Sequence, residues 1–280
     1  MLCINNIADL RKQVREWRAA RKKIALVPTM GNLHAGHLSL VEKARQDADK
    51  VITSIFVNPT QFVEGEDYAE YPRTLEVDLG RLDELGTDLV FNPEVNEIYS
   101  AGLEGQTQVL VPGLDNIFCG KFRPGHFSGV ATVVTKLFGI VQPDIAIFGE
   151  KDYQQLLVIK RFVDDLHIPV EIIGAATVRE EDGLALSSRN IYLSDEERKI
   201  APVLYKTLSE IAECIRMGKD DYAAMEEKAI DDLSKIGFKP EYLSICDADN
   251  LSMPGDGDLV VLAAVWLGWA RLIDNVIIRR

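Results

Sequence analysis

The stretch PTMGNLHAGHLSL, residues 28–40, decides the fold of this chain. It begins where the apolar run IALVP (24–28) ends, makes a turn that contains glycine, and enters a helical pattern, HLSLVEKARQDA (37–48). A buried strand that leads through such a turn into a helix directs backbone N–H groups and the positive end of the helix toward an anion. The stretch therefore predicts an α/β sheet with an anion site at its first turn.

Apolar runs alternate with helical patterns on either side of this stretch. A short strand and a charged amphipathic helix precede it, strand-like runs follow at 51–59, 88–93, 144–149 and 170–175, and helical patterns lie at 74–86, 127–141 and 153–166. Continuous apolar strands between helices are typical of a parallel sheet that is covered on both faces.

The pattern changes after about residue 177. Helical patterns at 195–217 and 221–236 are followed by three strand-like runs with short links, EYLSICD, DLVVLAAVWLG and ARLIDNVII. Consecutive strands with tight links favour an antiparallel sheet. We therefore expect an α/β fold, with a Rossmann-type parallel-sheet domain over residues 1–177 and a smaller C-terminal α+β domain over 178–280 that closes over the active site.

Composition and charge limit the classes of partner. Of the 280 residues, 47% are hydrophobic and 27% are charged, with a formal net charge of −13. No long run of lysine or arginine offsets this charge, which argues against a nucleic-acid partner. An anionic substrate would have to be attracted by a local positive site.

Cysteine usage and hydropathy predict a cytoplasmic protein. The four cysteines are scattered without a CxxC pair, so a disulfide framework or a zinc site is not expected. The longest apolar stretch, 259–270, is shorter than the roughly 20 residues that span a bilayer, and the N-terminus has no signal-peptide pattern. We expect no membrane partner.

The HAGH segment offers two imidazoles three residues apart at the start of a helix. His34 and His37 would share one face of that helix, and Gly36 would let a flat base approach the backbone. Two imidazoles there can donate hydrogen bonds to phosphate oxygens as negative charge develops. The alternatives are a surface pair of histidines or half of a zinc site.

A second segment, FGEKDYQQ (148–155), follows a predicted strand at the sheet edge where open α/β sheets bind ligands. Lys151 could neutralise phosphate charge, Asp152 could hold a ribose or an ion, and Gln155 could reach a polar substrate. The alternative is an ordinary cluster of charges at the start of a helix.

Two further segments carry polar groups. Ser187, Ser188 and Arg189 of LSSRN (186–190) could clamp a triphosphate, or could belong to a loop that caps the next helix. In SIFVNPTQF (54–62), Asn58 and Gln61 suit recognition of hydroxyl and carboxylate groups, or form a plain Asn-Pro turn. RPGHFSGV (123–130) similarly contains an arginine for an anion, or is a loop before a helix.

Taken together, these segments resemble the pantothenate synthetase (pantoate–β-alanine ligase) family. The match consists of PTMGNLHAGH, SIFVNPTQF, YPRTLEVD, RPGHFSGV, FGEKDYQQ, DGLALSSRN and LGWARLIDN, in the family's order and over essentially the whole chain. HxGH alone is shared by a wider nucleotidyltransferase superfamily, whereas the other segments are more specific.

The resemblance implies a reaction in two steps. The carboxylate of pantoate attacks the α-phosphorus of ATP, which gives pantoyl adenylate and pyrophosphate; the amine of β-alanine then attacks the acyl carbon and releases pantothenate and AMP. Mg²⁺ accompanies ATP, and a cytoplasmic homodimer is typical. The resemblance does not identify the magnesium ligands.

The resemblance also implies roles for residues. His37 is the proposed proton donor, with His34 and Lys151 as its catalytic partners on the phosphates. Gln61, Gln155 and Asn58 bind pantoate, and Gln61 also binds β-alanine. The ATP site is lined by Met30, Gly31, Asn32, Leu33, His34, Ala35, Gly36, His37, Gly149, Glu150, Lys151, Asp152, Val178, Leu186, Ser187, Ser188 and Arg189.

Two other classes of function remain open at this point. Another nucleotidyltransferase, such as a cytidylyltransferase or a fragment of a tRNA synthetase, would share HAGH, although the net charge of −13 argues against a tRNA partner. A nucleotide sensor without catalysis would need the ATP site but not Asn58, Gln61 and Gln155.

Overall fold

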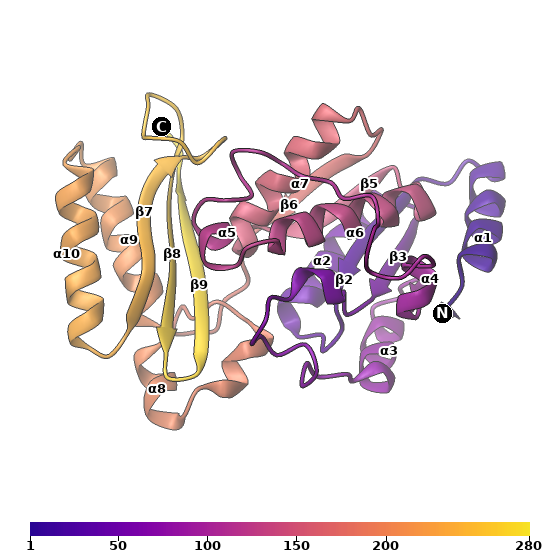
Figure 1. Ribbon diagram of the computed structural model, residues 1–280, viewed down its shortest axis with the longest axis horizontal. Coiled ribbons are helices and arrows are strands. Elements are labelled where there is room, and N and C mark those ends of the chain that lie inside the picture. Colours follow the sequence, from indigo (N-terminus) through magenta and orange to yellow (C-terminus); the bar gives the residue numbers. More distant parts are fainter. The chain divides into compact units, whose positions relative to one another are not determined.

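The computed structural model describes all 280 residues, Met1–Arg280, and divides into two compact units (Figure 1). One unit comprises Met1–Glu150 and Val158–Ala176, and the other comprises Lys151–Leu157 and Thr177–Arg280. The first contains a six-stranded sheet and the second a three-stranded sheet. The expected fold class is confirmed, and the segment 151–157 is grouped with the C-terminal unit although it lies before residue 177.

The sheet of the first unit is parallel throughout and has the order β1-β4-β3-β2-β5-β6. Its strands are β1 (Leu2–Ile4), β2 (Ile24–Thr29), β3 (Lys50–Ile55), β4 (Leu89–Phe91), β5 (Ile145–Gly149) and β6 (Glu171–Ala175). The chain moves from β2 to β3 on one side, and β5 later pairs with β2 on the other side. The strand order therefore reverses at β2 and β5, and ligands of such sheets bind beside the carboxyl ends of these strands.

Helices cover this sheet on both faces. The helices of this unit are α1 (Ile7–Ala19), α2 (Ala35–Asp47), α3 (Leu75–Glu84) and α6 (His126–Val141), and two short helices that were not expected, α4 (Val95–Ile98) and α5 (Cys119–Phe122). The helix α2 packs on β2, β3 and β5, where Val27 and Val41 belong to one apolar cluster. Successive strand residues point to opposite faces, and Leu26 is 0% exposed like its neighbours. Both faces of β2 are therefore buried.

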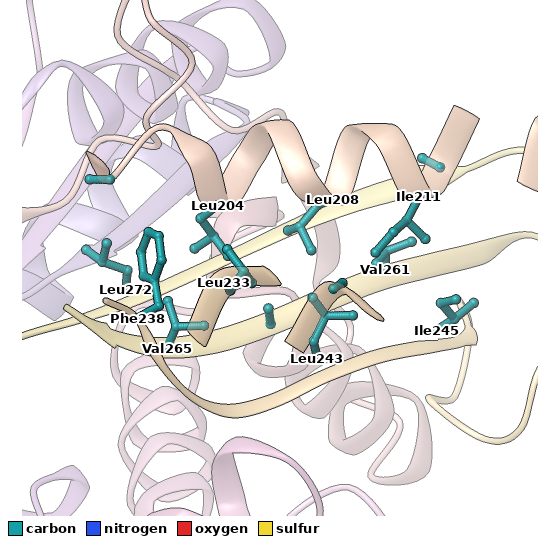
Figure 2. Packing of buried hydrophobic residues seen from close by; sticks show 14 of the residues in the cluster. Leu204, Leu208, Ile211, Leu233, Phe238, Leu243, Ile245, Val261, Val265 and Leu272 are labelled. Carbon is teal, nitrogen blue, oxygen red and sulfur yellow. The ribbon is translucent and has the colours of Figure 1, made fainter. Parts of the chain in front are cut away.

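The second unit consists of helices packed on an antiparallel sheet. Its elements are α8 (Asp195–Ile200), α9 (Val203–Arg216), α10 (Tyr222–Lys235), β7 (Lys239–Asp247), β8 (Leu259–Leu267) and β9 (Ala270–Ile278). Figure 2 shows Leu204, Leu208 and Ile211 of α9 in one row, and they share a buried cluster with Val261 and Val265 of β8. The spacing of the three α9 side chains is that of one helix face.

Two predicted elements were wrong in extent, each at a proline. The expected helix 195–217 is two helices, because Pro202 cannot donate the backbone hydrogen bond that a continuous helix needs there. The expected strand 51–59 ends at Ile55, and Pro59 begins a short 3₁₀ turn, η1 (Pro59–Gln61).

The helix α7 (Tyr153–Asp165) follows a second 3₁₀ turn, η2 (Glu150–Asp152), after β5. No helix in the chain combines the length and the apolar character that crossing a membrane requires.

Candidate active site

The turn between β2 and α2 is held by a buried carboxylate. Gly31 and Asn32 have positive φ angles of 80° and 49°, so the chain turns sharply there. The carboxylate of Asp78 on α3 accepts hydrogen bonds from the backbone N–H groups of Asn32 and Leu33, each at 2.8 Å, and from the hydroxyl of Thr74 at 3.1 Å. Asp78 is 1% exposed. It fixes the geometry of the turn that leads to His34.

The two imidazoles face each other at the start of α2. The ring centroids of His34 and His37 lie 4.1 Å apart at an interplanar angle of 33°, and both side chains are half-buried. The Nδ1 of His34 accepts the N–H of Gly36 at 3.1 Å, and the Nδ1 of His37 accepts the N–H of His34 at 3.4 Å. A neutral imidazole that accepts at Nδ1 carries its proton on Nε2. Each ring therefore presents an Nε2–H donor.

That backbone N–H groups of this turn bind an anion stays a prediction, and four of these groups have partners within the chain. The N–H of Gly31 is bonded to the hydroxyl of Thr29, those of Asn32 and Leu33 to Asp78, and that of His34 to His37. Each of these four donors therefore has a partner within the chain.

Gln61 lies beside the same turn. Its Nε2 is 2.9 Å from the sulfur of Met30, which follows β2, and its Oε1 accepts a hydrogen bond from the Nδ2 of Asn58 at 3.2 Å. The structure thus brings together Met30 and Gln61, which were expected to contact ATP and pantoate respectively.

Asn58 is 1% exposed and bonded at both ends of its amide. Its Oδ1 accepts from the hydroxyls of Tyr99 at 2.6 Å and Thr60 at 3.0 Å, and its Nδ2 also donates to the carbonyl of Gly129 at 3.2 Å. Direct binding of pantoate by Asn58 stays a prediction, and these contacts favour a role in orienting Gln61.

The first turn of α6 holds the backbone of Gln61. The Nδ1 of His126 lies 2.7 Å from the carbonyl of Gln61, and its Nε2 lies 3.0 Å from Nη1 of Arg123. Because a guanidinium only donates, Nε2 must accept, and the Nδ1–H of His126 donates to Gln61. Arg123 forms a bidentate pair with Glu66 at 2.5 and 2.7 Å, so its guanidinium already has an intrachain anion.

The pair also governs the ionisation of Glu66. Burial raises the pKa of its carboxyl, but the hydrogen bonds and charge of Arg123, together with the backbone N–H of Val63, hold the pKa below its ordinary value of 4.5. The carboxylate is therefore ionised at neutral pH.

The candidate ATP-binding residues of the second unit include Lys151 and residues near it. Gly149 and Glu150 end the first segment of the parallel-sheet unit, and Lys151 follows them in the turn η2. A cavity of about 10 Å³, room for one water molecule, is lined by Lys151, Ser187 and Asn190 among other residues. The side chains of Lys151 and Gln155 are half-buried, and that of Asp152 is exposed.

The loop that carries the two serines is tied to its neighbours by backbone bonds. The N–H of Leu186 donates to the carbonyl of Val178 at 3.0 Å, and the hydroxyl of Ser187 accepts the N–H of Arg189 at 3.3 Å. Ser187 caps η3 (Ser188–Tyr192), and Ser194, just after the loop, caps α8, so the capping alternative describes real contacts of this segment. The cavity nevertheless places Ser187 beside Lys151.

The zinc alternative finds no support in the side-chain geometry. The chain contains no group of three or more His, Cys, Asp or Glu side chains placed to hold a metal ion. The pair of His34 and His37 therefore lacks the further ligands that a zinc site requires.

Asp78 and Gly129 were missed as functional positions by the sequence analysis. A signal existed for Asp78, because it lies among the apolar residues Leu75, Leu79 and Leu82 on one face of its helix, where an unpaired acid would be costly. Gly129 gave no comparable signal, since a glycine within an apolar helix does not reveal which backbone approaches it.

Comparisons with known proteins agree on one family. The family model for pantoate-beta-alanine ligase matches residues 2–277. The pantothenate synthetase of Azotobacter vinelandii is 55% identical over 99% of this chain and 98% of its own length. A crystal structure of pantothenate synthetase from Thermus thermophilus has a TM-score of 0.89 and 47% identity, and covers 99% of each chain.

A further solved relative was crystallised with ligands. The pantoate-beta-alanine ligase from Francisella tularensis, complexed with beta-gamma ATP and beta-alanine, has a TM-score of 0.80 and 38% identity, and the match covers 99% of this chain and 97% of that one.

Proposed function

The chain belongs to the pantoate–β-alanine ligase family, and from this premise we propose how its residues join pantoate to β-alanine with ATP. A carboxylate oxygen of pantoate attacks the α-phosphorus of ATP, and the bond from that phosphorus to pyrophosphate breaks. The β-alanine amine then attacks the acyl carbon of the enzyme-bound pantoyl adenylate, and AMP leaves with the former carboxylate oxygen. The amine loses a proton, and pantothenate is released.

The imidazole pair is the single observation that carries the mechanism. With both Nδ1 atoms accepting backbone N–H groups, the Nε2–H groups of His34 and His37 supply donors for the phosphate oxygens as charge moves to pyrophosphate. Donors that are already oriented need no reorganisation during the reaction, and one such donor is worth about 10²–10³ in rate. His37 also supplies the proton donor implied by the family resemblance.

Gln61 is the proposed contact for pantoate and for the incoming β-alanine. Its side-chain amide contacts Asn58 and Met30, and its backbone carbonyl accepts a hydrogen bond from His126, so both the side chain and the backbone of Gln61 are held. Gln155 is the second proposed amide for pantoate. Neutral amides suit a small hydroxy acid because they can pair with hydroxyl and carboxylate oxygens without adding charge.

The proposed ATP contacts include a positive charge for the triphosphate. Lys151 supplies a compact ammonium group, and Ser187, Ser188 and Arg189 supply further donors. The remaining proposed ATP contacts are Met30, Gly31, Asn32, Leu33, Ala35, Gly36, Gly149, Glu150, Asp152, Val178 and Leu186.

Mg²⁺ is proposed as the partner of the ATP phosphates. Magnesium in such sites is commonly held by phosphate oxygens, water and one or two carboxylates rather than by a protein cage. The absence of a built cluster of acidic and histidine ligands fits that mode of binding, and the exposed carboxylate of Asp152 is the protein ligand that we propose. The ion would neutralise phosphate charge.

Two further properties rest on the family resemblance. We propose a homodimer in the cytoplasm, and the four cysteines, none of which forms a disulfide, suit that reducing compartment. Closure of the C-terminal domain over the active site likewise stays a prediction.

Exchange of labelled pyrophosphate into ATP tests the proposed function. The wild-type protein should catalyse exchange that requires pantoate and Mg²⁺ and that no amino acid supports. Lys151→Ala should nearly abolish the exchange while the fold stays intact, since a charged hydrogen bond of this kind contributes about 1.5–3 kcal/mol. Exchange that depends on an amino acid, or that proceeds without pantoate, would contradict the assignment and favour another nucleotidyltransferase.

A further inference from the structure

The turn that carries Lys151 is held by a side chain from β9. The Nδ2 of Asn275 donates a hydrogen bond to the backbone carbonyl of Lys151 at 3.0 Å, and Asn275 is 6% exposed. The turn η2 has only three residues. The lysine side chain has four rotatable bonds, and the position of its backbone sets the region that the ammonium group can reach.

Asn275 is itself held by a buried ion pair. Asp274 is 4% exposed, and its Oδ1 accepts the backbone N–H of Asn275 at 2.8 Å. The same carboxylate receives a bidentate pair from Arg179 at 2.6 and 2.8 Å, and the guanidinium of Arg179 lies 3.6 Å from the ring centre of Tyr205. These contacts leave the backbone of β9 little freedom at residue 275.

The ion pair reaches the serine loop as well. Nη1 of Arg179 donates to the carbonyl of Gly183 at 3.1 Å, and the backbone of Arg179 forms a β-bridge with Ala185. Asp274 lines the small cavity between Lys151 and Ser187. One network therefore contacts the backbone of Lys151 and the residues that directly precede the proposed ATP-binding segment 186–189.

We propose that Asn275 is a positioning residue for the adenylation step, which acts by holding the backbone of Lys151 while the pair of Asp274 and Arg179 holds Asn275. The inference rests on the proposed role of Lys151 toward ATP. It gives a function to the segment RLIDN, whose role the reaction otherwise leaves unexplained. Asn275 does not contact substrate in this account, because its effect passes through Lys151.

The variants are chosen so that loss of the donor is separated from loss of stability. Asn275→Leu keeps the branched arrangement of four side-chain heavy atoms without a donor, and Asn275→Asp keeps the shape but loses the N–H group. Ile278→Ala is the matched control, because Ile278 is 1% exposed on the same strand and belongs to the apolar core. Variants of Asp274 are avoided, since they would leave Arg179 without its buried partner.

Single-turnover formation of pantoyl adenylate from labelled ATP, with enzyme in excess, gives the rate of the first step. Both variants of Asn275 should lower this rate by on the order of 10–100-fold, the effect of displacing a reacting group by about 1 Å. The KM for ATP should change less than the rate. Ile278→Ala should lower the thermal midpoint and keep the wild-type rate.

A double-mutant cycle then tests whether the effect passes through Lys151. In the Lys151→Ala background, Asn275→Leu should change the remaining rate by less than about twofold. An equal loss in both backgrounds, a wild-type rate in both variants of Asn275, or a matching loss in Ile278→Ala would overturn the inference.

Failure of the proposed function looks different in the same assay. If the wild-type protein forms no pantoyl adenylate, the proposed reaction is wrong. If the wild type is active and Lys151→Ala keeps its rate, the role of Lys151 is wrong, and with it the role of Asn275.

Discussion

The two ring nitrogens of His34 have different roles in this turn. Nδ1 accepts the N–H of Gly36 and so caps α2, while the proposed role toward phosphate belongs to Nε2. The hydrogen bond at Nδ1 stabilises the helix, and the Nε2–H group has the proposed role in catalysis. Substitutions that mimic only one nitrogen can therefore separate the two contributions.

His34→Asn should keep the stability of the protein and lose its rate. The Oδ1 of asparagine can replace Nδ1 as the cap, but the side chain offers no donor at the position of Nε2. We expect pantoate-dependent adenylation to fall by on the order of 10²–10³-fold. His34→Ala should show the same loss of rate and also a loss of about 0.5–2 kcal/mol in the free energy of unfolding, because the cap is gone. Urea unfolding and single-turnover kinetics of both variants check this; equal stabilities would contradict the capping role.

Glu66 should make stability depend on pH in the acid range. Its pKa in the folded state lies below the ordinary 4.5, because Arg123 and the backbone N–H of Val63 favour the carboxylate although burial opposes it. The folded state thus binds fewer protons than the unfolded state, so the contribution is complete above pH 4.5 and is lost as the pH falls through the lower folded value.

Glu66→Gln removes the ionisable group, so comparison with the wild type measures its contribution to the free energy of unfolding. The free energy of unfolding of the wild type should exceed that of the variant by about 1–3 kcal/mol at pH 7, the range for a hydrogen bond to a charged group. The difference should shrink as the pH is lowered below 4.5. Urea unfolding between pH 7 and pH 3 provides the measurement, and a difference that stays constant over that range would contradict the assignment.

At the scale of elements, α6 positions η1 by direct backbone contact. A Cβ atom on Gly129 would lie 2.1 Å from the carbonyl oxygen of Thr60 and 2.7 Å from the backbone nitrogen of Gln61. Rotation of a side chain cannot relieve this clash, because both neighbouring atoms belong to the backbone. Glycine at this position is therefore part of how Gln61 is placed.

Gly129→Ala should displace η1 and impair the use of pantoate. We expect the KM for pantoate to rise by on the order of 10–100-fold, with a smaller change for ATP, and the stability to fall by roughly 1–3 kcal/mol. Gly139→Ala on the same helix is the control, since a Cβ there meets nothing within 4 Å. It should be neutral or stabilise by about 0.5–1 kcal/mol. Similar kinetics in both variants would show that the contact with η1 does not place Gln61.

Local sequence patterns predicted most helices and strands. They missed features that depend on contacts between residues distant in sequence. The alternation of apolar strands and helices predicted the parallel sheet, and HAGH predicted the imidazole pair at a helix start. The break at Pro202 was readable from the residue itself. By contrast, the bond from Asn275 to Lys151 joins residues 124 positions apart, and no local pattern indicates such a partner.

At the scale of the whole molecule, a chain with a net charge of −13 must bind anionic substrates. We assign this task to a few local donors, the imidazoles of His34 and His37 and the ammonium group of Lys151. Because such donors would stabilise charge on departing pyrophosphate, pantoate is expected to attack the α-phosphorus of ATP. A ligase that forms an acyl phosphate would instead attack the γ-phosphorus and yield ADP.

Oxygen-18 labelling of pantoate distinguishes attack at the α-phosphorus from attack at the γ-phosphorus. With both carboxylate oxygens labelled, a complete turnover with ATP and β-alanine should place one labelled oxygen in AMP and none in pyrophosphate, as read by mass spectrometry of the products. Formation of ADP, or label in inorganic phosphate, would contradict the adenylate route and the roles given to His34 and His37.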